Sequence, residues 1–233
     1  MQRRGRCRER LLFLIGISTI LLVALSSTST PYLPTINTTH ERVKEFFQAL
    51  VPHDPISITK DADFEKLGFE GNGTESSPYL IRGLLIDAEE EICISIISTS
   101  VHFVIQDCEF YSDDDESGTG VYFEKVSYGA VIDCRFHSLS IGITALKSEY
   151  CEFIANWFAG LQKGIHLSQS LWMVIEGNEI IKCGYGVHLK KMDYSDVVSN
   201  TLSDSDYGLL IESSFDIHTL SNQISGSFFG LYF

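Results

Sequence analysis

The stretch GIHLSQSLWMVIEGNEIIKCGYGVHL, residues 164–189, contains the pattern that decides the fold. It opens with the phrase GIHL at Gly164 and returns to the similar phrase GVHL at Gly186, 22 residues later. Related phrases recur at the same step of 22 residues in both directions, and they open at glycines 120, 142, 208 and 230. A fixed period of this length indicates a solenoid, in which each repeat forms one coil stacked on the next.

A second column of residues keeps the same period. Fourteen residues after each of the first five glycines stands a cysteine or an asparagine: Cys134, Asn156, Asn178, Asn200 and Asn222. Cys108 begins the column one coil earlier, displaced by four extra residues in an acidic loop. We predict that these residues form a structural ladder whose amides hydrogen-bond from coil to coil. Asparagine tolerates the left-handed backbone of a bend, and we expect the glycines to be present for the same conformational reason.

Two solenoids have a period near 22, and the rest of the repeat separates them. Leucine-rich repeats require Leu five and eight residues before the asparagine, and neither position is Leu in any coil here. The link from each asparagine to the next glycine is short and has no helical periodicity. We therefore predict an all-β, single-stranded, right-handed parallel β-helix of 22-residue coils over residues 94–233. Alternation along its strands points Ile165 and Leu167 inward and His166 and His188 outward.

Residues 94–233 resemble the right-handed β-helix repeats of prokaryotic envelope proteins, a group that includes NosD-like proteins of copper-site maturation and carbohydrate-binding and sugar-hydrolase modules. The segment FEKLGFEGNGTESSPYLIRGLLID, residues 64–87, resembles the cap that often precedes such repeats. The resemblance covers roughly residues 56–233, and it implies a fold more specifically than an activity. The pectin-cleaving members carry Asp pairs with Gly-His-Gly and Arg-x-Lys phrases, and this sequence has neither phrase.

The N-terminal part divides into three segments. Five arginines between Arg3 and Arg10 precede an apolar run at residues 11–25, so residues 1–30 are predicted to be a signal peptide or a membrane anchor. Basic residues before the run keep that end in the cytoplasm, which predicts an extracytoplasmic body. Residues 31–55 read as a stalk with one short helix, and residues 56–93 as the N-terminal cap. Because Phe233 ends the sequence inside the repeating phrase GLYF, we expect a truncated C-terminal end.

The formal net charge of −14 argues against a nucleic-acid partner, because an acidic body repels phosphate backbones. Acidic residues stack at one place in the repeat. Asp107 and Asp133 directly precede Cys108 and Cys134, and we expect the inserted loop of Asp113, Asp114, Asp115 and Glu116 to overhang the same edge. Oxygen ligands at this density predict a candidate site for calcium or a cation-bridged sugar. The alternative is a solvated acidic turn.

His166 and His188 are predicted to stack one coil apart, which makes them a second candidate site, for copper or zinc. Their column neighbours, Thr144 and Leu210, offer no further ligand. Tyr122, Trp157 and Trp172 are candidate platforms for sugar rings, and the alternative is that they are half-buried packing residues. The outward columns that follow the glycines do not stack two acids, so no catalytic residue is assigned.

Three functions follow from these observations. The first is an extracytoplasmic envelope module that binds a glycan or a protein partner without catalysis and contacts the membrane through its N-terminal segment. The second is a polysaccharide lyase or glycoside hydrolase, which an acid pair on a strand face would favour. The third is a NosD-like accessory protein of metalloenzyme maturation, which a histidine column would favour.

Overall fold

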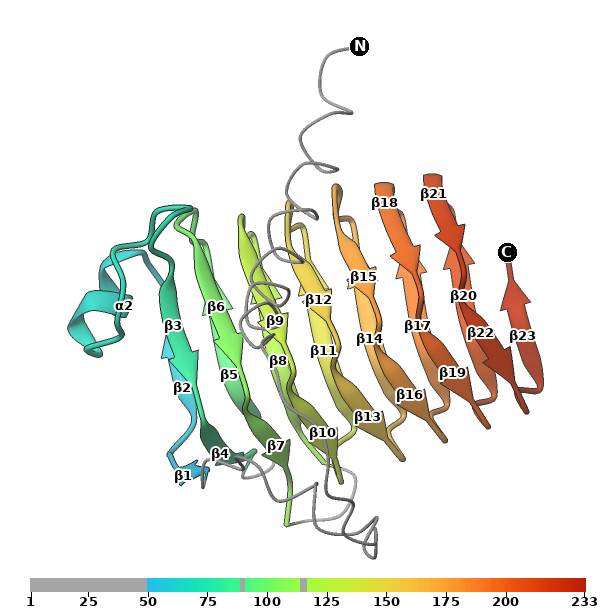
Figure 1. The fold of residues 1–233 in the computed structure, drawn as a ribbon, viewed down its shortest axis with the longest axis horizontal. Helices are drawn as coiled ribbons and strands as arrows, with labels where there is room; N and C mark the ends of the chain where they lie inside the picture. Colours follow the sequence, from blue (N-terminus) through green and yellow to red (C-terminus); the bar gives the residue numbers. More distant parts are fainter. Residues whose placement is uncertain (1–49, 89–90, 114–116) are drawn as a thin grey trace, which may run out of the picture. The chain divides into compact units, whose positions relative to one another are not determined.

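Three parallel β-sheets wrap around one continuous core in the computed structural model, which describes residues 50–88, 91–113 and 117–233 (Figure 1). Each full coil contributes one strand to sheet A, then one to sheet B, then one to sheet C. All pairings between neighbouring coils are parallel. The predicted all-β parallel β-helix is confirmed, and the three sheets exclude a leucine-rich repeat.

Strand lengths differ among the sheets: six-residue strands predominate in sheet B, whereas most strands of sheet A have three residues. Sheet A contains β1 (Val51–Pro52), β4 (Leu84–Asp87), β7 (Glu109–Tyr111), β10 (Arg135–His137), β13 (Trp157–Ala159), β16 (Glu179–Ile181), β19 (Thr201–Ser203) and β22 (Gln223–Ser225). Sheet B contains β2 (Ile56–Ile58), β5 (Ile92–Ile97), β8 (Thr119–Glu124), β11 (Ile141–Leu146), β14 (Lys163–Ser168), β17 (Tyr185–Lys190), β20 (Tyr207–Glu212) and β23 (Phe229–Tyr232). Sheet C contains β3 (Tyr79–Arg82), β6 (Phe103–Gln106), β9 (Gly129–Ile132), β12 (Glu152–Ile154), β15 (Val174–Glu176), β18 (Asp193–Val198) and β21 (Phe215–Leu220).

The three sheets begin before residue 94, where the predicted repeats start. Strands β1 to β4, within residues 51–87, already pair with the later coils in all three sheets. A single short helix, α2 (Ala62–Lys66), interrupts them, and Phe64 from this helix is fully buried. Its ring stacks on Tyr79 at 4.9 Å and packs against Phe103 at 5.2 Å, so α2 closes the N-terminal end of the core.

The predicted leader, residues 1–30, and most of the predicted stalk lie outside the described residues. Within the described part of the chain, no helix is long and apolar enough to cross a membrane.

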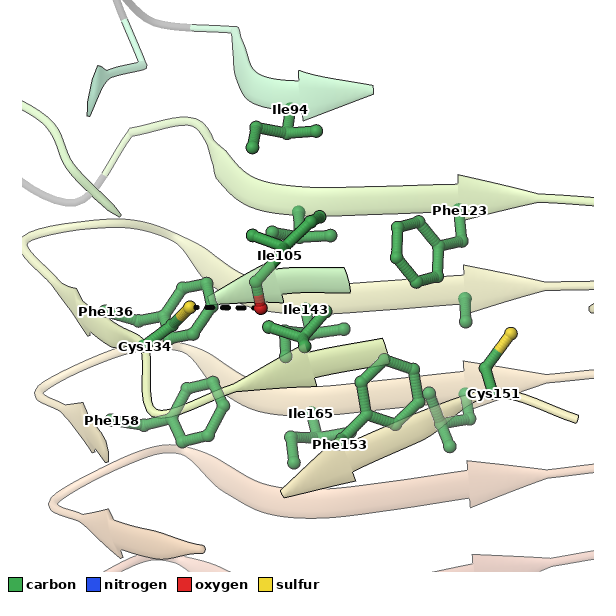
Figure 2. Close-up of a cluster of buried hydrophobic side chains, with 14 of the residues drawn as sticks. Ile94, Ile105, Phe123, Cys134, Phe136, Ile143, Cys151, Phe153, Phe158 and Ile165 are labelled. Carbon is green, nitrogen blue, oxygen red and sulfur yellow. Dashed lines mark hydrogen bonds between the residues drawn. The ribbon is translucent and has the colours of Figure 1, made fainter. Parts of the chain in front are cut away.

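The core consists of apolar columns that face inward from each sheet (Figure 2). Ile143 and Ile165 pair in sheet B and are fully buried. Phe136 and Phe158, from adjacent coils of sheet A, stack with ring centroids 4.7 Å apart and an interplanar angle of 9°. Complete burial of such a side chain contributes about 1.5–3 kcal/mol, so the columns supply the main stabilising free energy of each coil.

The glycine column has a steric cause rather than the conformational one expected from the sequence. Its members do not have positive φ. A Cβ atom on Gly142 would lie 2.6 Å from the carbonyl oxygen of Gly164 in the next coil and 2.6 Å from the ring of Phe158. Glycine is therefore needed at this position because the backbone of Gly164 and the ring of Phe158 leave no space for a Cβ atom.

A residue with left-handed backbone conformation directly precedes each ladder residue, at the bend between sheet C and sheet A. Asp107, Asp133, Ala155 and Ser199 have φ between 52° and 57°, and Gly177 occupies the same position with φ 64°. The expectation that the asparagines themselves adopt this conformation is therefore wrong. Their contribution is the side-chain amide, which bonds groups that the bend leaves without backbone partners.

The ladder runs through the interior of the bend. Asn178 donates from Nδ2 to the carbonyl oxygen of Phe153 at 2.9 Å and to Oδ1 of Asn200 at 2.9 Å. Its own Oδ1 accepts the backbone N–H of Asn156 at 3.0 Å. Cys134 substitutes for an amide in the same column, because its Sγ donates to the carbonyl oxygen of Ile105 at 3.7 Å (Figure 2). Cys108 makes the equivalent bond to Ile81 at 3.8 Å, and Asn222 ends the column half-buried.

We predict that Asn178→Leu lowers the free energy of unfolding by about 1–3 kcal/mol, because it leaves buried backbone groups without partners. Urea denaturation measures the change. Glu179→Leu, at the exposed neighbouring position, is the control and should alter stability by less than about 0.5 kcal/mol. Equal effects of the two substitutions would contradict a buried ladder.

The glycine column makes a separate prediction. We expect Gly142→Ala to cost about 1–3 kcal/mol, because the added methyl group has no space between two coils. Gly160→Ala is the control: Gly160 has φ 71° but an open surrounding, and Ser138, Lys182 and Asp204 occupy the same bend in other coils. Thermal melting that ranks Gly160→Ala as the more harmful change would refute the steric explanation.

Candidate functional site

A hollow of about 380 Å³ lies at the N-terminal end of sheet A. Strand β1 and the residues after it form one wall, and β4 and β7 form the floor. The lining is mixed: apolar Pro52, Pro55 and Leu85 alternate with polar His53, Asp54, Asp87 and Tyr111. The hollow is open to solvent on one side, and it combines one aromatic ring with several polar groups.

Tyr111 forms the aromatic part of the hollow. Its ring stacks on His137 of the next coil at 6.0 Å, and Nε2 of His137 lies 3.0 Å from Oε1 of Glu109. Partial burial raises the pKa of the Tyr111 hydroxyl, and the nearby carboxylates of Asp113 and Asp87 add to the rise. The hydroxyl therefore remains a hydrogen-bond donor, while the carboxylates around it act as acceptors.

The predicted acidic edge is divided by the structure. Asp107 and Asp133 lie one coil apart at the bend before sheet A, and both are exposed. Partial desolvation and the charge of Asp107 raise the pKa of Asp133. Asp113 follows the opposite end of β7, beside Tyr111, so it does not share an edge with the first two. Asp114, Asp115 and Glu116 lie outside the described residues.

The two histidines stack as predicted, on the outer face of sheet B. His166 of β14 pairs in register with His188 of β17, and their ring centroids are 4.7 Å apart. His188 is 9% exposed although it points outward, because Tyr185 packs on its ring at 5.5 Å and Glu212 covers its edge. Nε2 of His188 lies 2.7 Å from Oε2 of Glu212, and this hydrogen bond lowers the pKa of Glu212.

Neither Nδ1 atom in this histidine pair has a hydrogen-bond partner, and both are buried. A buried polar atom without a partner costs about 1–3 kcal/mol. Burial, together with Lys163, His188 and Lys190, lowers the pKa of His166 to about 4. At neutral pH its imidazole is therefore uncharged, with a nitrogen lone pair available for an electrophile.

An acid pair that sequence reasoning missed lies on the outer face of sheet C. Partial burial raises the pKa of Glu176 in β15, and the carboxylate of Asp196 in β18 adds to the rise. Asp196 also pairs with His218, at 3.1 Å between Oδ1 and Nδ1. The two acids are 20 rather than 22 residues apart, so they lie diagonally to each other on neighbouring strands. A search of in-register columns alone cannot find them.

An aromatic column follows the bend between sheets B and C. His102, Tyr128, Tyr150, Trp172 and Tyr194 stack in sequence, with centroid distances from 4.6 to 6.1 Å. Trp172 is thus part of a stack, and only Tyr194 at its end is more than half exposed. The ring faces are used within the column, so it is mainly a stabilising feature.

The described cysteines are free and buried. Burial raises the pKa of Cys93 and Cys151 to about 12 and that of Cys183 to about 11, which keeps these thiols protonated. No group of three or more His, Cys, Asp or Glu side chains that could hold a metal ion occurs within residues 50–88, 91–113 and 117–233.

The three parallel sheets define the class of protein as a parallel β-helix. The family described as "Periplasmic copper-binding protein (NosD)" matches residues 73–233, and the chain belongs to this family. No curated protein sequence matches the chain.

Two solved structures show a weaker likeness. One is named a glycoside hydrolase, with 11% identity and a TM-score of 0.35, over 64% of this chain and 38% of that one. The other is Geobacillus virus E2 ORF18, with 9% identity and a TM-score of 0.24, over 76% of this chain and 47% of that one. The chain thus spans less than half the length of either structure, and at these scores neither informs the function.

The histidine pair predicts a dependence of stability on pH. The folded pKa of His166, about 4, lies below its ordinary value of 6.5, so between these values only the unfolded state takes up the proton. Stability should therefore fall as the pH drops from 6.5 to 4. The loss should be about 1–2 kcal/mol for this group, since the ring is partly solvated. Urea denaturation at a series of pH values measures this loss. His166→Gln should remove it, whereas His218→Gln should leave the pH dependence of the free energy of unfolding unchanged.

Proposed function

We propose that this chain is an extracytoplasmic NosD-family module that binds a glycan without catalysis. The observation that carries the proposal is the hollow beside Tyr111. An aromatic ring packs against the apolar face of a sugar, and the carboxylates of Asp54 and Asp87 accept hydrogen bonds from sugar hydroxyl groups. The family description places its members in the periplasm, in agreement with the extracytoplasmic body expected from the basic and apolar N-terminal segment.

A glycan array probed with the full chain, with and without calcium, tests this function. We expect binding to a restricted set of glycans, weakened at least tenfold by Tyr111→Ala and by Asp87→Asn. Tyr194→Ala removes an exposed tyrosine far along the solenoid and should leave binding intact. An array without hits, or unchanged binding by Tyr111→Ala, would contradict the proposal. A calcium-dependent signal lost in Asp107→Asn with Asp133→Asn would assign the cation to that pair.

A polysaccharide-cleaving activity is the second candidate, and Glu176 with Asp196 favours it. Glycoside hydrolysis requires one carboxyl group with a raised pKa and a second that stays ionised. The raised pKa of Glu176 fits the first role, and Asp196, whose Oδ1 lies 3.1 Å from Nδ1 of His218, is the neighbouring carboxyl group. The test is to incubate the chain with the glycans that it binds on the array and to measure newly released reducing ends. Release that Glu176→Gln abolishes would establish this activity and contradict binding without catalysis.

A metal-binding accessory role is the third candidate. The family description names copper, and the observation in this chain that favours such a role is the pair of orphaned imidazole nitrogens at His166 and His188. An envelope protein that carries copper could serve the maturation of a partner metalloenzyme. Copper binding by the full chain, measured at equilibrium, decides whether this candidate stands.

A further inference from the structure

The hollow at the N-terminal end of sheet A has room for one flat ring. Tyr111 of β7 lies on one side of it, and the residues after β1 form the opposite wall. A hydrogen bond from the backbone N–H of His53 to the carbonyl oxygen of Leu85, at 3.0 Å, keeps this wall in line with the coils. Because β4 lies between β1 and β7, the backbones of the two sides are two coil steps apart, about 9.6 Å. Stacked rings need about 4.5–7 Å between their centres, so a single ring fits against Tyr111.

The ring of Tyr111 presents one face to the hollow. His137 covers its other face, with centroids 6.0 Å apart and an interplanar angle of 18°. His137 follows from β10, which lies on the side of β7 away from β4, so the opposite face of Tyr111 is directed at the hollow. Trp172 differs, because Tyr150 and Tyr194 cover both of its faces. The stack of His137 and Tyr111 therefore ends at the hollow, where a ligand ring would continue it.

The charge around the hollow is negative. Asp54 and Asp87 line it, and none of the described lining residues is Lys or Arg. Burial and the charges of Asp113 and Asp87 raise the pKa of the Tyr111 hydroxyl, so both carboxylates act at this ring. Such a site repels uronic acids and sulfated sugars. Ionised carboxylates only accept hydrogen bonds, and the bonds that they accept from a charged donor are about twice as strong as those between neutral groups.

We propose that the hollow selects glycans that contain an amino sugar with an unacetylated, protonated amine. The sugar ring packs on the open face of Tyr111, and the ammonium group donates hydrogen bonds to the carboxylates of Asp87 and Asp54. An N-acetyl group has no charge, so an acetylated sugar loses these charge-assisted bonds. Because the hollow is open to solvent on one side, one residue of a longer glycan can enter it while the others remain outside. This inference rests on the glycan-binding function proposed above and names the ligand class of that site.

Isothermal titration of the full chain with two matched trimers tests the ligand class. One is a β-1,4-linked trimer of glucosamine, and the other is its fully N-acetylated form, so the two differ only at the amine. At about pH 6, we expect the glucosamine trimer to bind at least tenfold more tightly. Its affinity should fall as sodium chloride rises from about 0.05 to about 0.5 M, because salt screens the attraction between ammonium and carboxylate groups.

Substitutions at the hollow separate the effect of charge from that of stacking. Asp87→Asn and Asp54→Asn keep the side-chain shape, so each should weaken the glucosamine trimer at least tenfold and the acetylated trimer less than about twofold. Tyr111→Ala should weaken both trimers, because both stack on its ring. Asp204→Asn is the matched control: it removes an exposed carboxylate at the bend after β19, four coil steps from β7, and should bind like the parent. Circular dichroism verifies that each variant is folded.

The outcomes distinguish the amine from the glycan site itself. Equal affinity of the parent for the two trimers, or a preference that Asp87→Asn and Asp54→Asn leave intact, would refute selection for an amine. If Tyr111→Ala still abolishes binding in either case, the glycan site stands without it. Binding of neither trimer, while the array shows another glycan, would likewise refute the amine alone. Absence of binding to any glycan would refute both this inference and the proposed function.

Discussion

Parallel hydrogen bonding between coils with a 22-residue register is the constraint on which the other features depend. It places each residue directly over its equivalent in the next coil, about 4.8 Å away. A shift of one residue would reverse every side chain between core and solvent. The apolar columns, the asparagine ladder and the glycines at the close approach are all consequences of keeping this register.

The same register creates the candidate sites, because it repeats outward side chains as strictly as inward ones. Two histidines separated by 22 residues must stack, and stacking desolvates both rings. Where the chain departs from the period, other chemistry arises. The acidic insertion after Tyr111 leaves the pairing of β7 with β10 intact and places Asp113 next to the hollow.

Much of the fold could be predicted because columns are visible in the sequence. The interior positions of Ile165 and Leu167 and the stacking of His166 on His188 follow from period and alternation alone. The cause of the glycine column could not be predicted, since the clash at Gly142 involves a ring from another part of the same coil stack. Sequence also could not separate Asp113 from Asp107, because the short strand between them reveals its direction only when folded.

The hollow could not be predicted from the sequence for a related reason. Its wall comes from residues 52–55, which have no repeat signature and were expected to form a stalk. The diagonal meeting of Glu176 and Asp196 likewise depends on strand geometry rather than on column spacing. The hollow and the diagonal acid pair therefore lie where the repeat is broken or crossed, whereas the stacked histidines follow the repeat itself.

The in-register stacking of the coils is tested most directly by a distance between spin labels at positions 135 and 223. These exposed positions occupy the same column of sheet A and are separated by four coil-to-coil steps. The register places their backbones about 19 Å apart despite 88 intervening steps of sequence. A narrow dipolar distribution consistent with that spacing is the predicted result. A broad distribution centred well beyond it would contradict the 22-residue coil.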